Sequence, residues 1–200
     1  EEDAADTRSR LVALFLVFAV VIFFWMAFHQ NGLTLTYFAR DFVKKSSTGV
    51  EGMMFNVTNL VAVIFIIYSL FSLFQSKKMG GKLISALVIL ASAGYLYYDY
   101  TQLPISGVEI SAPIFQQFNP SFVVALTPIS MALFGWLASK GKEPSAPRKI
   151  GYGMLVAGIA YVVMIMASIG LSYNLTDAQR VSPNWLVSTY LILTFAELLL

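Results

Sequence analysis

One uninterrupted apolar run constrains the fold of this chain more than any other feature. The 18 residues from Leu11 to Phe28 include no charged or strongly polar side chain. As an α-helix rising ~1.5 Å per residue, such a run nearly crosses the ~30 Å hydrocarbon core of a bilayer. His29, Gln30 and Asn31 follow at once in the same stretch. Because polar side chains are costly in lipid, we expect this cluster to face a protein interior or a water-filled path.

The composition extends this expectation to the whole chain. Hydrophobic residues make up 58% and charged residues 12%, whereas a soluble domain is about a quarter charged. We therefore predict an all-α, polytopic helical membrane protein with six transmembrane helices. The apolar runs place these helices at about 11–38, 57–74, 83–98, 120–138, 150–171 and 185–200. The net charge of +2, without a basic cluster, argues against a nucleic-acid partner, and the absence of cysteine excludes disulfides and thiolate chemistry.

The basic residues predict the orientation of the helices. Six spans place the lead-in 1–10, the turn 75–82 and the loop 139–149 on one side of the membrane. Nine basic residues belong to that side: Arg8, Arg10, Lys77, Lys78, Lys82, Lys140, Lys142, Arg148 and Lys149. The other four lie on the opposite side: Arg40, Lys44, Lys45 and Arg180. The positive-inside rule then makes the first side, with the N-terminal end of the chain, cytoplasmic.

Both ends of the chain predict that it is an internal fragment of a longer protein. It begins at Glu1 with an acidic stretch, without an initiator methionine or the basic start of a secretory signal. It stops at Leu200 inside an apolar run. We expect part of the polypeptide to precede it and part to follow it.

Glu197 is the acidic side chain of the last predicted span. Tyr190 and Thr194 precede it by seven and three residues, which places the three on one helix face. A carboxylate at membrane depth needs a partner, water or a proton, and could bind an amine or carry a proton. Glu197 could instead reach the interface from a span that is just ending. The apolar residues that follow it favour depth.

The first span carries a second candidate face. Trp25, His29, Gly32 and Thr36 recur at helical spacing, whereas Gln30 lies off that face. Histidine changes charge nearest to neutral pH, so His29 could relay or sense protons. It could equally be fixed between two helices by hydrogen bonds, and the spacing does not separate these alternatives.

Asn119 precedes Pro120 at the start of the fourth predicted span. Asparagine as an N-cap and proline as the first helical residue form a common helix start, which is the simpler interpretation from spacing alone. With one histidine and no cysteine, we expect no metal site. The chain shows no nucleophile, base and acid set for catalysis, so we do not predict an enzyme.

Three stretches together resemble the proton-coupled oligopeptide transporter family of the major facilitator superfamily. Phe24-Trp25-Met26-Ala27-Phe28-His29-Gln30-Asn31-Gly32 resembles the seventh core helix of that family. Phe118-Asn119-Pro120-Ser121-Phe122 is similar to the start of the eighth. Val181-Ser182-Pro183-Asn184-Trp185, followed by Thr194-Phe195-Ala196-Glu197, resembles the tenth.

The resemblance implies a core of two six-helix bundles, with this chain as most of the C-terminal bundle. The span 11–38 would be core helix seven, and 120–200 would hold core helices eight to ten, the last truncated. The segment 57–100 would be an inserted transmembrane hairpin, which we expect to pack at the periphery.

The resemblance also implies roles for individual residues. Trp25 would help to wall a side-chain pocket, while Asn119 and Glu197 would meet the amino terminus of a peptide. The position of His29 often carries an acidic residue linked to gating and proton coupling, so histidine there departs from the family pattern. Further candidates for lining the cavity are Gln30, Thr36, Tyr190 and Thr194.

The predicted function is proton-coupled symport of di- and tripeptides across the cytoplasmic (inner) membrane by alternating access. Its partners would be small peptides, the lipid bilayer and the missing N-terminal half. Protons would be the coupling ion, without another cofactor. The alternatives are transport of another small solute on the same scaffold, and a non-transporting membrane subunit that scaffolds a complex.

Overall fold

Helices form wherever the apolar runs predict them, and polar or glycine-containing segments separate them. The computed structural model describes residues 2–172, 175–176 and 179–200. The first predicted span extends further than expected in both directions: α1 covers Glu2–Phe28, a short 3-10 helix η1 covers His29–Gly32, and α2 covers Thr34–Phe42. The predicted lead-in 1–10 is thus helical from Glu2 onward, and Glu1 lies outside the described residues.

The remaining elements follow the predicted order. They are β1 Ser46–Ser47, α3 Gly49–Met53, α4 Val57–Gln75, α5 Met79–Thr101, β2 Val108–Glu109, η2 Ala112–Gln117, α6 Phe118–Ser139, α7 Ala146–Ser168 and α8 Asn184–Glu197. Asn56 caps α4, because its side-chain oxygen accepts a hydrogen bond from the backbone N–H of Thr58 at 3.1 Å. The two short strands pair antiparallel, Ser46 opposite Glu109 and Ser47 opposite Val108.

The chain is a polytopic, all-α membrane protein, as the sequence predicts. Within the described residues, five helical segments have the length and apolarity to cross a membrane: Asp6–Phe42, Val57–Gln75, Met79–Thr101, Ala112–Ser139 and Ala146–Ser168. The sixth predicted span forms the 14-residue helix α8. At ~1.5 Å per residue, α8 reaches about two thirds of the way across a hydrocarbon core.

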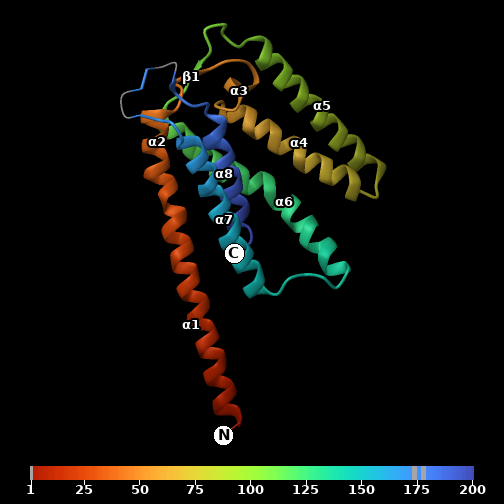
Figure 1. Ribbon diagram of the computed structural model, residues 1–200. Helices are drawn as coiled ribbons and strands as arrows, with labels where there is room; N and C mark the ends of the chain where they lie inside the picture. Colours follow the sequence, from red (N-terminus) through yellow and green to blue (C-terminus); the bar gives the residue numbers. More distant parts are fainter. Residues whose placement is uncertain (1, 173–174, 177–178) are drawn as a thin grey trace.

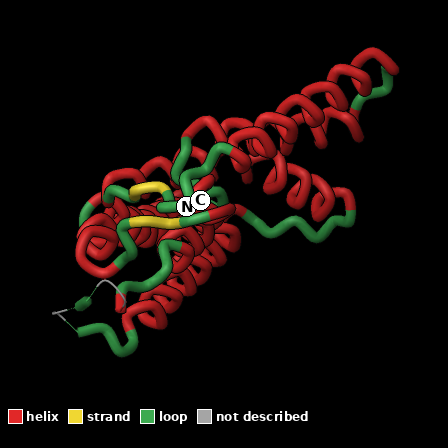
Figure 2. The backbone as a smooth tube through the Cα atoms, turned by 90° about the horizontal axis from the view of Figure 1, so that it is seen from above, coloured by secondary structure: helices red, strands yellow, loops and turns green. Residues whose placement is uncertain are grey.

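Helix α8 lies at the centre of the packing. It runs between α6 and α7, the C-terminal part of α1 contacts α7, and the N-terminal part of α1 extends beyond the other helices (Figure 1). The α4–α5 hairpin contacts α6 and projects away from the other helices (Figures 1 and 2). Leu186, Tyr190 and Leu193 of α8 are fully buried, and so is Phe118 at the start of α6. The outer surfaces of α1, α4 and α5 expose large apolar side chains. These surfaces fit a lipid environment, in which an exposed apolar side chain has no free-energy cost.

A close approach between α7 and α8 depends on Gly153. A Cβ atom built on this glycine would lie 2.6 Å from Leu200 Cδ1 and 3.0 Å from the carbonyl oxygen of Ala196. The neighbouring Gly151 and Gly158 have no such neighbour within 4 Å. Gly153 therefore sets the position of the end of α8, one residue before Glu197.

Candidate functional site

Helix α8 brings three polar side chains to its buried face. Tyr190, Thr194 and Glu197 recur at helical spacing, and the packing of α6 and α7 around α8 turns this face inward. Tyr190 and Thr194 have no exposed surface, whereas Glu197 is partly buried. A buried hydroxyl or carboxylate needs a hydrogen-bond partner, so the neighbours of these groups define the site.

Asn119 of α6 supplies one such partner. Its Nδ2 donates to Thr194 Oγ1 and to Glu197 Oε2, both at 3.2 Å. The interpretation of Asn119 as an N-cap is wrong, because α6 begins at Phe118 with Gln117 as its N-cap residue, and η2 extends the helical segment back to Ala112. Asn119 thus lies inside the span Ala112–Ser139 and uses its amide to join α6 to α8.

Glu197 has a neutral partner rather than a cationic one. In the described part of the chain, no lysine or arginine forms an ion pair with it. The carboxylate therefore holds a hydrogen bond from an amide, which leaves it able to accept a proton or to attract a ligand's ammonium group.

The first span is broken beside this cluster. Residues His29–Gly32 form a 3-10 turn, and Leu33, at φ −118°, ψ −76°, separates it from α2. The backbone carbonyl of Asn31 accepts hydrogen bonds from Tyr190 Oη at 3.1 Å and from Thr36 Oγ1 at 3.3 Å. The Tyr161 hydroxyl of α7 donates to the carbonyl of Ala27. Tyrosine hydroxyls of α7 and α8 thus donate hydrogen bonds to backbone carbonyl oxygens at the break. A stretch of 3-10 geometry within a helix often marks a hinge.

A cavity of about 200 Å³ lies between the broken span, η2, α6 and α8. Its lining residues are Phe28, His29, Asn31, Gly32, Gln116, Asn119 and Tyr190. An imidazole, three amides and a phenol therefore meet in one small space, next to the carboxylate that Asn119 contacts. A small space with several hydrogen-bonding side chains can orient a small polar ligand.

The structure brings some of the predicted site residues together and leaves others apart. Asn119, Thr194 and Glu197 are joined by hydrogen bonds, and Tyr190 and His29 line the cavity. Thr36 reaches the cavity through Gln116, whose Nε2 donates to Thr36 Oγ1 at 3.2 Å.

Trp25 and Gln30 make local contacts. Trp25 is 39% exposed, and its ring lies 5.8 Å from the His29 ring, centroid to centroid. The side chain of exposed Gln30 bonds within its own segment, accepting from Thr34 Oγ1 at 2.6 Å. The helical face predicted from Trp25 to Thr36 does not continue, because the 3-10 turn changes the angular step between residues from about 100° to about 120°.

One polar residue of the cavity, Gln116, was not among the predicted site residues, and Asn31 was predicted only as a member of the polar cluster that follows Phe28. Gln116 fell in a segment interpreted as a loop, although η2 makes it helical. The three consecutive polar residues and Gly32 at the end of an apolar run are the signals that could have pointed to the break.

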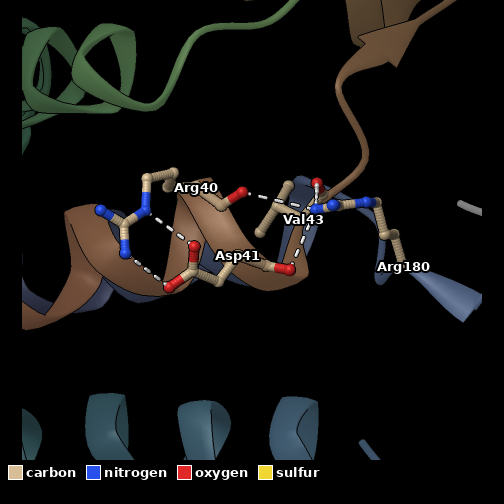
Figure 3. Close-up of polar contacts among 4 residues, drawn as sticks. All are labelled: Arg40, Asp41, Val43 and Arg180. Atoms are coloured by element: carbon tan, nitrogen blue, oxygen red, sulfur yellow. Dashed lines mark hydrogen bonds and ion pairs between the residues drawn. The ribbon is translucent and has the colours of Figure 1, made fainter. Parts of the chain in front are cut away.

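Contacts at the opposite end of α2 hold the broken span against the segment that leads into α8. Arg180 Nη1 donates to the carbonyl oxygens of Arg40, Asp41 and Val43 at 3.4, 3.0 and 3.3 Å (Figure 3). These carbonyls lie at the C-terminal end of α2, where a positive charge is favourable. Val43 and Val181 also form an isolated parallel bridge.

Glu51 adds a further connection at this end. Its two carboxylate oxygens accept hydrogen bonds from Ser47 Oγ at 2.5 Å and from Ser182 Oγ at 2.6 Å. The connector after α2 and the segment before α8 are thus tied by side-chain and backbone hydrogen bonds.

Comparison with known proteins identifies the family to which this chain belongs. The sequence model of the POT family matches residues 95–200, just over half of the chain. The chain belongs to the POT family. The match covers α6, α7 and α8, the helices that carry Asn119, Thr194 and Glu197.

Among its relatives, this POT-family chain is 26% identical over 163 residues to dipeptide and tripeptide permease B of Xenorhabdus bovienii, covering 74% of the chain and 32% of that protein. It is 26% identical over 216 residues to dipeptide and tripeptide permease B of Salmonella typhimurium, covering 100% of the chain and 40% of that protein. It is 30% identical over 140 residues to the peptide transporter YePEPT of Yersinia enterocolitica, covering 63% of the chain and 27% of that protein. The chain therefore spans between about a third and two fifths of the length of the first two relatives. No solved structure matches it significantly.

Proposed function

We propose that the chain is part of the C-terminal half of a longer transporter that couples inward proton flow to uptake of di- and tripeptides. Membership of the POT family and relatives named as peptide permeases support peptide transport as the activity. The N-terminal half would supply the opposite wall of the binding site. The two halves would expose that site to each side of the membrane in turn.

The hydrogen-bonded set of Asn119, Thr194 and Glu197 carries this proposal. A peptide presents an ammonium group at one end, and Glu197 is a partly buried carboxylate whose described partner is an amide. In our account Glu197 binds the ammonium, while Asn119 positions the carboxylate and contributes a second polar contact. Protonation of Glu197 would weaken its hold on the ammonium, which links proton binding to peptide release.

His29 and Trp25 take the adjoining roles. His29 lines the cavity at the 3-10 break, where gain of a proton would place a positive charge close to Asn31 and Asn119. We assign it to proton coupling or gating, and Trp25, whose ring lies against that of His29, to a side-chain pocket completed by the other half of the transporter. No cofactor or catalytic step is needed, since the proton is the coupling ion.

The α4–α5 hairpin would be an insertion between core helices. It contacts α6 through α4, and the residues that line the cavity come from other elements. Two crossings preserve the orientation of the helices that follow. We propose that the transporter resides in the inner membrane, with the N-terminal end of α1 on the cytoplasmic side, as the distribution of basic residues favours.

The test uses the complete transporter in proteoliposomes with a proton gradient. Glu197→Gln keeps the size of the side chain and removes its charge. Because a hydrogen bond to a charged group contributes ~1.5–3 kcal/mol, the KM for dipeptide uptake should rise about tenfold or more. Glu109→Gln, at an exposed carboxylate of β2, is the matched control and should transport like the wild type. Wild-type uptake by Glu197→Gln would refute the proposal.

A further inference from the structure

The side chain of Asn31 is the least satisfied polar group beside the cavity. The residue is 8% exposed, and neither Nδ2 nor Oδ1 has a hydrogen-bond partner in the described part of the chain. Asn59 and Gln117 leave one side-chain atom each unpartnered, whereas Asn31 leaves both. Its backbone carbonyl oxygen accepts hydrogen bonds from the hydroxyl groups of Tyr190 and Thr36, which hold the backbone of this residue in place.

A buried amide without partners is costly for the folded protein. A leucine of similar size at this position would avoid that cost. Unsatisfied polar groups in native proteins therefore point to a partner that binds in the working state. Asn31 lines the cavity together with His29 and Asn119, which places this residue beside the proposed substrate site.

The donor and acceptor of a side-chain amide match a peptide group. Nδ2 can donate to a carbonyl while Oδ1 accepts from an N–H of the same ligand. We propose that Asn31 binds the backbone peptide group next to the substrate's amino terminus. This inference rests on the proposed function, and it names the residue that separates peptides from free amino acids.

The position of Asn119 supports this assignment. Asn119 lines the same cavity as Asn31 and also contacts Glu197 at 3.2 Å. A ligand with its ammonium at Glu197 therefore extends past Asn119 toward Asn31. At about 200 Å³ the cavity is smaller than the ~300–1,000 Å³ of typical ligand pockets, so it accommodates one end of a ligand and not a whole tripeptide.

The test compares a dipeptide with its ester analogue, in which an oxygen replaces the peptide N–H. Both compete for uptake of a labelled dipeptide by the complete transporter in proteoliposomes. The wild type should prefer the amide by about three- to tenfold, the usual worth of one hydrogen bond. In Asn31→Leu the preference should fall to near one. In Gln75→Leu, an amide removed from α4 outside the cavity, the preference should stay at the wild-type value.

A second readout protects the inference from a folding defect. Thermal unfolding without peptide should show Asn31→Leu at least as stable as the wild type, because an unsatisfied amide is removed. Asn31→Ala, which adds no apolar bulk, repeats the uptake comparison. If both Asn31 variants preferred the amide over the ester by the same factor as the wild type, this inference would be overturned and the proposed function would stand. Absence of dipeptide uptake by the wild type would overturn the proposed function and this inference with it.

Discussion

The approach of α8 to α7 at Gly153 yields a prediction whose size follows from the structure. Alanine at this position would place Cβ 3.0 Å from the Ala196 carbonyl oxygen and 2.6 Å from Leu200 Cδ1. A leucine methyl group can rotate away, but the carbonyl belongs to the backbone of α8. Relieving that contact requires the two helices to separate by a few tenths of an ångström.

The energetic balance has two parts. Replacing a helical glycine by alanine contributes about 1 kcal/mol to stability through helix propensity. Overpacking a close helix contact costs about 1–3 kcal/mol. Gly151→Ala lies on the same helix, and nothing lies within 4 Å of its new Cβ. This variant therefore gains the helix propensity of alanine without the cost of overpacking. The free energy of unfolding of Gly153→Ala should therefore be about 1–3 kcal/mol lower than that of Gly151→Ala.

The assay is thermal unfolding of the complete transporter in detergent, alongside dipeptide uptake. Gly153→Ala should unfold at a lower temperature than Gly151→Ala, by about 2–4 °C per kcal/mol in a chain of this size and by less in a longer one. Uptake should also fall, since movement of Ala196 displaces Glu197 from Asn119. If Gly153→Ala matched Gly151→Ala in both measurements, the close approach of α7 and α8 would not position the site.

Three further changes test other parts of the structure. Tyr190→Phe removes one of two hydrogen-bond donors to the Asn31 carbonyl and should lower the free energy of unfolding, measured by denaturation, by about 0.5–1.5 kcal/mol. A loss above ~3 kcal/mol would contradict the idea that Thr36 and Tyr190 share this acceptor. Arg180→Ala removes the cation at the end of α2 and should lower the free energy of unfolding by about 1–2 kcal/mol. An unchanged melting temperature would show that the contact is not stabilising. Asp99→Asn, which replaces the acceptor of the 2.7 Å hydrogen bond from Asn59 within the α4–α5 hairpin, should leave the KM for dipeptides unchanged, and a raised KM would contradict a peripheral hairpin.

Hydropathy was sufficient to predict the class of fold, because an apolar run such as Leu11–Phe28 has few ways to satisfy its backbone in lipid. The helix ends were predicted less well. Polar residues of the lead-in extend α1 through i, i+4 pairing such as Asp6 with Arg10, and Ala112–Gln117 forms a 3-10 helix with its proline in the first turn, where proline is tolerated. Neither extension has a hydropathy signal.

The site was predicted in part. The face of α8 that carries Thr194 and Glu197 follows from regular α-helical spacing, and that helix is regular in the structure. The first span is not regular, so the helical face counted from Trp25 does not continue beyond His29. The break depends on hydrogen bonds from Tyr161 and Tyr190, which lie far away in the sequence. The pairing of Asn119 with Glu197 likewise depends on tertiary packing, and only the family resemblance placed the two residues at one site.

The most direct test of the central claim is whether Glu197 recognises the amino terminus of a peptide. Uptake competition by a dipeptide and by its N-acetyl derivative should be measured for the wild type and for Glu197→Gln. The account predicts that the wild type prefers the free amine by about tenfold or more, and that this preference nearly disappears in Glu197→Gln. The same preference in both proteins would show that the ammonium binds elsewhere and would contradict the account.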